Sequence, residues 1–178
     1  VSQGGPEIIA DQGTFIHSTT TPGYEDINPL VNPVDTNLYW GGNDVGPAAV
    51  DTVYVGSQFA EDTTVHGFYL RQAGNATTGA NSMVQESTDG IKWTDVEQIT
   101  ITEFGLNLGQ YTLTTPRTGK FMRLLAKSNT LCAACGWAIS YLRWFGLADV
   151  CITTILPTVE LPQVPSSVAI PDRCTLTD

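Results

Sequence analysis

Short runs of β-branched and aromatic residues, each followed by turn-forming residues, constrain the fold of this chain more than any other feature. The runs occupy residues 51–59, 64–72, 83–87, 96–102, 110–114, 120–127 and 136–146. Turn-formers separate them at 74–75, 78–81, 89–90 and 116–119. Many short strands with such punctuation are typical of a β-sandwich or barrel. No segment keeps apolar residues at helical spacing over three turns, so we expect an all-β fold with little helix.

The stretch VQESTDGIKWTDV, residues 84–96, predicts a β-hairpin. Asp89 tolerates a left-handed backbone, and Gly90 has no Cβ to clash there. An Asp-Gly pair between two β-prone runs is therefore a strong short-range hairpin pattern. We expect the hairpin to extend from Val84 to Trp93.

The composition favours a single domain and argues against nucleic-acid and membrane partners. The chain has 178 residues, 42% hydrophobic and 15% charged, which is enough for one core and little for two. The net charge of −10 comes mainly from having only eight Lys and Arg. Such a surface repels nucleic-acid phosphates and anionic membranes, and no basic patch offsets this. No apolar stretch approaches the roughly 20 residues that span a bilayer, and the first residues do not resemble a signal peptide, as in an already processed chain.

Four cysteines, Cys132, Cys135, Cys151 and Cys174, suit an oxidised, extracellular protein, and three pairings are possible. We favour Cys151 with Cys174 as a loop-closing bridge and Cys132 with Cys135 as a local one. The C-x-x-C spacing also occurs in zinc and redox sites. However, a structural zinc site usually supplies a second close pair, and no βαβ pattern surrounds these cysteines.

A single glycosylation sequon begins at Asn75. It lies in a Gly/Thr/Asn-rich stretch that is typical of an exposed loop. In a eukaryotic secretory source we expect a glycan on Asn75, whereas in a bacterial or viral source the sequon means little.

Two terminal segments fall outside the strand pattern and are expected to extend a single domain at residues 13–147. Residues 1–12 are polar and Gly-rich, and residues 148–178 contain Pro157, Pro162, Pro165 and Pro171. Prolines every few residues exclude helix and central strands, which leaves extended chain.

Four motifs occur in a characteristic order. The first is NPVDTNLYWGG, with Asp35 and Trp40, and the second is HGFYLRQ. The third is the hairpin from Ser87 to Trp93, and the fourth is Phe121-Met122-Arg123-Leu124, which precedes a last strand that ends at Phe145-Gly146. Together they resemble the discoidin-like family of coagulation-factor C-type domains and galactose-binding modules. The resemblance covers residues 13–147. It implies an antiparallel β-sandwich of the discoidin-like jelly-roll type.

The resemblance implies packing roles for Trp40, Trp93 and Trp144, with Trp93 as a core or sheet-face anchor after the hairpin turn. Arg123 lies among apolar neighbours in a strand. Because a buried guanidinium group needs hydrogen-bond partners, we expect a carboxylate or carbonyl oxygens around it.

The resemblance also implies a structural calcium site. Many members of the family hold calcium near the Asp-containing segment, with a Glu of the final strand as a further ligand. Asp35 and the Thr36 hydroxyl would supply oxygens here, which hard cations prefer. Tyr141 stands where that Glu is expected, which departs from the family pattern, and Asp35 could instead accept backbone hydrogen bonds in a turn.

Catalytic patterns are missing from the sequence. There is no Gly-x-Ser-x-Gly elbow, no His-Glu-x-x-His and no phosphate-binding Gly loop. The adjacent acids at 25–26 and 61–62 could be imagined as an acid/base pair, but adjacent acids on loops are usually just solvated. We expect a protein that is not an enzyme.

Binding is the remaining expectation. In this family ligands usually meet loops at one end of the sandwich, and the resemblance implies three such loops, at 17–29, 74–82 and 127–137. A sugar site needs an aromatic face and a few planar polar groups. The candidates are His17, Tyr24, Arg71, Asn129 and Trp137. We expect an extracellular or surface-associated recognition or adhesion module whose partner is a glycan or glycoprotein.

The alternative is a structural subunit of an extracellular filament, coat or surface layer. The alternating apolar and Pro residues of 151–174 could lie along an exposed sheet edge of a neighbouring molecule. In that case the terminal tails would mediate self-association.

Overall fold

The computed structural model describes residues 5–18, 27–34, 38–44, 51–72, 81–103, 107–128 and 136–147. These residues form strands and no helix. The strands are β1 (Pro6–Ile8), β2 (Thr14–His17), β3 (Trp40–Asp44), β4 (Tyr54–Gln72), β5 (Asn81–Ser87), β6 (Thr94–Thr100), β7 (Leu108–Ser128) and β8 (Gly136–Leu147). Within this part of the chain no helix is long and apolar enough to cross a membrane.

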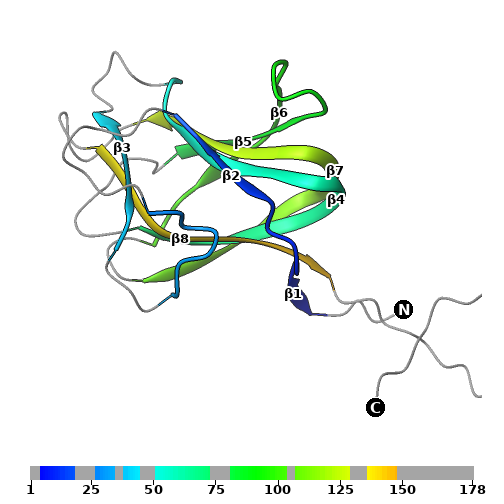
Figure 1. The fold of residues 1–178 in the computed structure, drawn as a ribbon, viewed down its shortest axis with the longest axis horizontal. Coiled ribbons are helices and arrows are strands. Elements are labelled where there is room, and N and C mark those ends of the chain that lie inside the picture. The colour runs from blue at the N-terminus through cyan, green and yellow to red at the C-terminus, as the bar shows by residue number, and fades with distance from the viewer. Residues whose placement is uncertain are drawn as a thin grey trace, which may run out of the picture.

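The strands form a two-layered antiparallel sandwich, which confirms the predicted fold class (Figure 1). One layer has the order β2, first half of β4, second half of β7, β5 and β6. In the other layer the second half of β4 lies between the first half of β7 and β8, and β1 and β3 pair with the far edge of β8. Thus β4 and β7 pass together from one layer to the other. The register of β4 shifts between Gln58 and Thr63 and again between Val65 and Gly67, where this passage occurs.

Two pairs of runs expected to be separate strands are continuous in the structure. Runs 51–59 and 64–72 join in β4, and runs 110–114 and 120–127 join in β7, so the turn expected at 116–119 is wrong. Pairing of Val65 with Arg117 and of Thr63 with Gly119 carries the ladder through that segment. Pro116 falls at a register shift of this ladder, a position where strands tolerate a residue without an N–H.

Part of the predicted N-terminal extension belongs to the sheet. Strand β1 pairs with the end of β8, with Glu7 opposite Gly146. The Gln12 side chain then bridges to β8, because its Nε2 donates to the Trp144 carbonyl oxygen at 2.9 Å and its Oε1 accepts the Trp144 N–H at 2.7 Å. The tail at 148–178 lies outside the described residues, and the domain boundaries stay predictions.

The core between the layers contains three fully buried tryptophans, Trp40, Trp137 and Trp144. The packing roles predicted for Trp40 and Trp144 are confirmed. The Trp144 indole N–H donates to the Ser57 hydroxyl at 2.8 Å. This bond satisfies two polar groups that would otherwise be buried without partners.

A hairpin is present as predicted, formed by β5 and β6, but its bounds differ: residues 88–93, with Trp93 among them, form the connection, and the second strand begins at Thr94. The Ser87 hydroxyl oxygen accepts the Gly90 N–H at 2.9 Å. One carboxylate oxygen of Asp89 accepts the N–H groups of Ile91 and Lys92, both at 2.8 Å. Gly90 has a φ of 73°, which explains the glycine. The turn is longer than a two-residue Asp-Gly turn because side-chain oxygens of Ser87 and Asp89 replace backbone acceptors.

Trp93 anchors the hairpin to the outer face of its layer. The Arg123 guanidinium lies 3.8 Å from the centre of the Trp93 ring and 4.4 Å from that of Tyr54. Its Nε donates to the side-chain carbonyl oxygen of Gln85 at 2.7 Å, which confirms a carbonyl partner. Burial lowers the pKa of Arg123 from its usual value. The two stacked rings, which the sequence did not predict, compensate part of that desolvation.

We expect replacement of Asp89 by Ala to lower the urea midpoint of unfolding at neutral pH. Backbone N–H groups of Lys92 and Ile91 lower the pKa of Asp89 below its usual 3.8. The carboxylate therefore stabilises the fold above that value, and its contribution is lost as the pH falls through the lowered pKa. The difference between wild type and Asp89→Ala should shrink in acid. Asp89→Asn, which keeps an acceptor but no charge, should show a smaller and pH-independent loss, and a difference that persists in acid would contradict the assignment.

Candidate functional site

One end of the sandwich collects the strand ends that border the predicted binding loops (Figure 1). Asn81, at the start of β5, pairs with Ser128 at the end of β7 and with Thr100 at the end of β6. Asp44 at the end of β3 pairs with Gly136 at the start of β8. The described strand ends that border segments 19–26, 45–50, 73–80 and 129–135 therefore lie at this end, which we call the loop end. Tyr24, Asp35, Thr36, Asn75, Asn129 and the four cysteines lie outside the described residues.

Among the predicted ligand residues that the structure describes, His17 borders the loop end at the end of β2. It is the last residue of β2, opposite Val55, and its ring is half-buried. The ring stacks on Phe15, with centroids 4.7 Å apart, and meets the edge of Trp40 at 5.6 Å. These two aromatic neighbours fix the plane of the imidazole.

The Nδ1 atom of His17 has two competing neighbours. It lies 3.2 Å from the Trp40 indole nitrogen, which can only donate, and 2.6 Å from the Ser18 carbonyl oxygen, which can only accept. The tautomer of His17 decides which of the two it bonds. The ring is thus held by its backbone and core neighbours in either tautomer.

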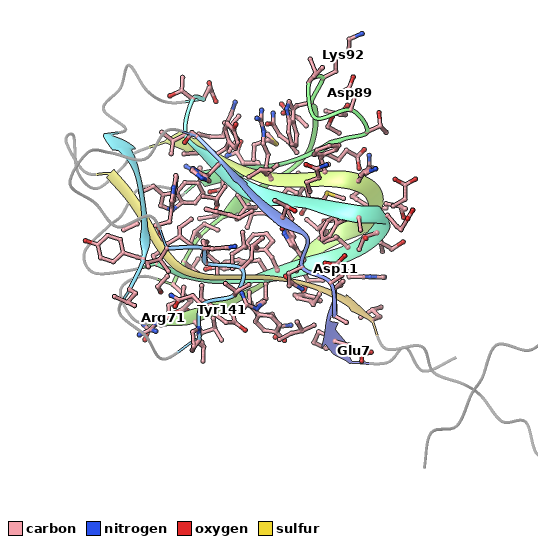
Figure 2. The ribbon with its side chains drawn as sticks, in the orientation of Figure 1. Glu7, Asp11, Arg71, Asp89, Lys92 and Tyr141 are labelled. Atoms are coloured by element: carbon pink, nitrogen blue, oxygen red, sulfur yellow. The ribbon has the colours of Figure 1, made fainter. Side chains whose placement is uncertain are left out.

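Arg71, the second predicted ligand residue, uses its guanidinium group to bind the backbone of another segment. It lies opposite Tyr141 on the neighbouring strand β8 (Figure 2). Its side chain is buried, and its Nη1 donates to the carbonyl oxygen of Val34. Arg71 therefore anchors the segment 27–34 to the layer that contains β8.

Trp137, the third, lies in the core. Its side chain is 0% exposed, and its indole N–H donates to Gln72 Oε1 at 3.0 Å. The Gln72 Nε2 donates in turn to the carbonyl oxygen of Glu103 at 3.2 Å. A ring buried on all sides offers no face to a sugar, so Trp137 supports the loop end from beneath.

Segment 27–34 is held by a second arginine. Arg143 donates from Nη1 to the Pro29 carbonyl oxygen at 2.7 Å and from Nη2 to the Asn32 carbonyl oxygen at 3.2 Å. Its guanidinium lies 4.6 Å from the centre of the Tyr141 ring. Burial lowers the pKa of Arg143, while Tyr141 acts in the opposite direction.

Asn32 completes this clamp. It is 6% exposed, and its Nδ2 donates to the carbonyl oxygens of Leu38 at 2.9 Å and of Ser140 at 2.7 Å. Neither Asn32 nor Arg143 was singled out from the sequence, because a polar side chain that binds distant carbonyls leaves no local pattern.

Asp35 and Thr36 lie outside the described residues, so the calcium site that the family resemblance implies stays a prediction. Backbone carbonyls on both sides of these two residues already accept hydrogen bonds, from Arg71, Arg143 and Asn32. On the described side, Tyr141 supplies a ring that packs on Arg143 where the family pattern expects a carboxylate. Among the described residues no three His, Cys, Asp or Glu side chains group as metal ligands.

Two shallow hollows lie on described surfaces away from these residues. In one, lined by Val96, Glu97, Thr114, Thr115 and Arg117, the Glu97 carboxylate accepts the N–H and hydroxyl of Thr114, and Arg117 pairs with Glu86. The other is lined by Asp11, Gly13, Thr14, Gln58, Phe59, Ala60 and Lys120. The polar groups of the first are committed to neighbours, and the second lacks an aromatic face open on a sugar.

The sequence matches no family model and no curated protein. Solved structures share its fold. The chitosan-binding module 1 of a chitosanase/glucanase from Paenibacillus sp. IK-5 has a TM-score of 0.59 at 21% identity, covering 79% of this chain and 99% of the module. The CBM32 of AlyQ, solved with 4,5-unsaturated mannuronic acid, has a TM-score of 0.56 at 16% identity and covers 82% and 98%.

A third similar structure is the family 32 CBM of NanJ from C. perfringens, solved with galactose. It has a TM-score of 0.57 at 11% identity and covers 75% of this chain and 93% of that module. These likenesses confirm that the chain has the discoidin-like, galactose-binding-like fold.

Proposed function

We propose that this protein is a non-catalytic carbohydrate-binding module that acts outside the cell and holds a glycan at the loop end. The observation that supports this most is the fold likeness to carbohydrate-binding modules over about four-fifths of the chain, 79% for the chitosan-binding module. Ligands as different as chitotriose, an unsaturated mannuronic acid and galactose accompany these folds. The fold therefore supports glycan binding and leaves the choice of glycan to the residues of this chain.

His17 is the described residue that we assign to ligand contact. It borders segment 19–26, and its ring is held by Phe15 and Trp40, so little side-chain freedom is lost on binding. Tyr24 and Asn129 complete the proposed contacts from their places in the sequence. Arg71 and Trp137 support this end through Val34 and Gln72 and are not assigned to the ligand.

The alternative of a filament or coat subunit depends on the terminal tails. Of these tails only residues 5–12 are described, and there Pro6–Ile8 pairs with β8 of the same chain. That alternative stays a prediction, and no described contact favours it.

The proposal is tested by binding to a panel of immobilised glycans that includes galactose, N-acetylglucosamine oligomers, chitosan and uronic-acid polymers. We expect retention on at least one member and a loss of roughly tenfold in affinity, about 1.4 kcal/mol, in His17→Ala. The matched control is His66→Ala, which changes the chain's other histidine, beside Gly146 in the region where β8 meets β1. Retention on no glycan, or equal losses for both variants, would contradict the proposal.

A further inference from the structure

The second of the two described hollows has polar side chains that are not bonded to neighbours. Its volume is about 360 Å³, which lies in the range of sites for small organic ligands. Asp11, on the stretch that joins β1 to β2, forms part of its rim (Figure 2). Because Lys120 supplies the only positive charge among the lining residues, we call it the Lys120 hollow.

The backbone on two sides of the Lys120 hollow is held in place. The ladder between β4 and β7 shifts between Gln58 and Thr63, so residues 59–62 leave the regular pairing. On the other side Gly13 has a φ of 73°, and a Cβ there would collide with the Gln58 carbonyl oxygen. The Asp11 carboxylate accepts the Gly13 N–H at 2.8 Å. The hollow therefore follows from the register of the sheet and from a glycine that lets two segments approach closely.

Lys120 brings a cation without a counter-ion to this hollow. Of the three lysines of the chain, Lys127 pairs with Asp51 at 2.6 Å. Lys92 is exposed on the turn at 88–93, where water solvates its charge. Lys120 is half-buried, and its ammonium group makes no ion pair or hydrogen bond with any described residue. A partly desolvated ammonium gains most from an anionic partner.

Two uncharged polar side chains line the same hollow. Thr14 of β2 lies directly opposite Gln58 of β4, so their side chains share one face of the layer. Gln58 in turn lies opposite Phe121, the neighbour of Lys120 in β7. Within the described part of the chain, neither the Thr14 hydroxyl nor the Gln58 side-chain amide makes a hydrogen bond. Both are therefore available to a ligand, unlike the polar groups of the first hollow.

Asp11 adds an acceptor. One of its carboxylate oxygens accepts the Gly13 N–H, and the second has no donor among the described residues. No ion pair joins Asp11 to Lys120 there, so the hollow offers a cation and an acceptor separately. Such a combination fits a ligand that carries both a carboxylate and hydroxyl groups.

We infer that the Lys120 hollow binds a small hydroxylated carboxylate, such as a uronic acid. The ligand carboxylate meets Lys120, and its hydroxyl groups meet Asp11, Thr14 and Gln58. This site is separate from the loop end and does not depend on the glycan proposed there. Because no aromatic face lies open in the hollow, binding comes from charge and hydrogen bonds, and we expect a Kd in the millimolar range.

An NMR titration of backbone amide signals tests the inference, with D-glucuronate as the probe and its methyl ester as the uncharged counterpart. At an ionic strength of about 0.15 M, charges more than about 8 Å apart are largely screened, so the net charge of −10 does not dominate. We expect glucuronate to bind about fivefold or more tightly than the ester. It should shift the amide signals of Gly13, Thr14, Gln58 and Ala60. Equal affinity for the two probes, no binding, or shifts confined to the loop end would overturn the inference.

Two lysine variants locate the carboxylate. Lys120→Gln keeps a polar side chain and removes the charge, so glucuronate should bind about fivefold or more weakly, as the ester does to the wild type. Lys92→Gln removes an exposed charge of the same sign and should leave the affinity unchanged. Equal losses in the two variants would show that only the net charge matters and would overturn the inference. The amide spectrum of each variant shows directly that it is folded.

A further pair of variants separates the hydroxyl contacts and the loop end from this effect. Thr14→Val removes only a hydroxyl group and should weaken binding about twofold or more. His17→Ala should leave glucuronate binding unchanged. Failure of glucuronate to bind would thus leave the proposed function standing, and failure of the glycan panel would leave the Lys120 hollow standing.

Discussion

Replacing Gly67 by Ala should lower the free energy of unfolding by about 3 kcal/mol. For a domain of this size that corresponds to a fall of about 6–12 °C in Tm. A Cβ at this position would lie 2.2 Å from the Tyr111 carbonyl oxygen and 2.4 Å from Cζ of Phe145. Gly67 pairs with β7 on one side and with β8 on the other. The added methyl group would therefore press against the β7 backbone and against the buried Phe145 ring, and both are held in place by the sheet and the core.

The matched control is Gly119→Ala in β7. There the nearest atom to an added Cβ is the Ser87 carbonyl oxygen at 3.7 Å, an ordinary contact. We expect a change within about 0.5 kcal/mol. Urea denaturation followed by tryptophan fluorescence measures both variants. Equal stability of the two would mean that Phe145 and β7 move apart freely, and the described packing of β4 against β8 would be wrong.

Replacing Trp137 by Ala should cost about 4 kcal/mol, as expected for removal of a fully buried indole. Trp137→Phe separates packing from hydrogen bonding, because it keeps a ring in the core and removes the N–H that Gln72 Oε1 accepts. A buried oxygen without its donor should lower the free energy of unfolding by roughly 1–3 kcal/mol.

The glycan affinity of Trp137→Phe tells a supporting residue from a ligand contact. We expect the folded variant to bind the best glycan of the panel as tightly as the wild type does. A loss comparable to that of His17→Ala would show that the indole meets the sugar after all. A thermal melt of each variant shows whether it is folded at the temperature of the binding assay. Only variants that are folded there are compared.

Much of the fold could be predicted from local patterns. The β5–β6 hairpin followed from Asp89 and Gly90 because turn geometry depends on residues that are adjacent in sequence. The predicted break in β7 was wrong because the pairing of residues 117–119 with β4 is a long-range contact. A proline and a glycine indicate a turn locally, but a register shift in the partner strand can accommodate them.

The sequence predicted which strand ends border the proposed site better than it predicted the residues of that site. The order of the motifs indicated loops at one end of a sandwich, and the register of β3, β5, β7 and β8 brings the bordering strand ends together. His17 lies there. Arg71 and Trp137 were candidates because guanidinium and indole groups often bind sugars, yet both types also satisfy buried partners, and sequence does not distinguish the two uses.

By itself the sequence determined the all-β class, the hairpin turn and the scarcity of positive charge, because each depends on residue type or on neighbours along the chain. Only the tertiary structure decided that Arg71 and Arg143 bind the carbonyls of segment 27–34, that Arg123 stacks between two rings, and that Trp137 lies in the core. These outcomes depend on which distant residues the antiparallel register places side by side. A side chain's role follows from its burial and its partners, and both are properties of the folded chain.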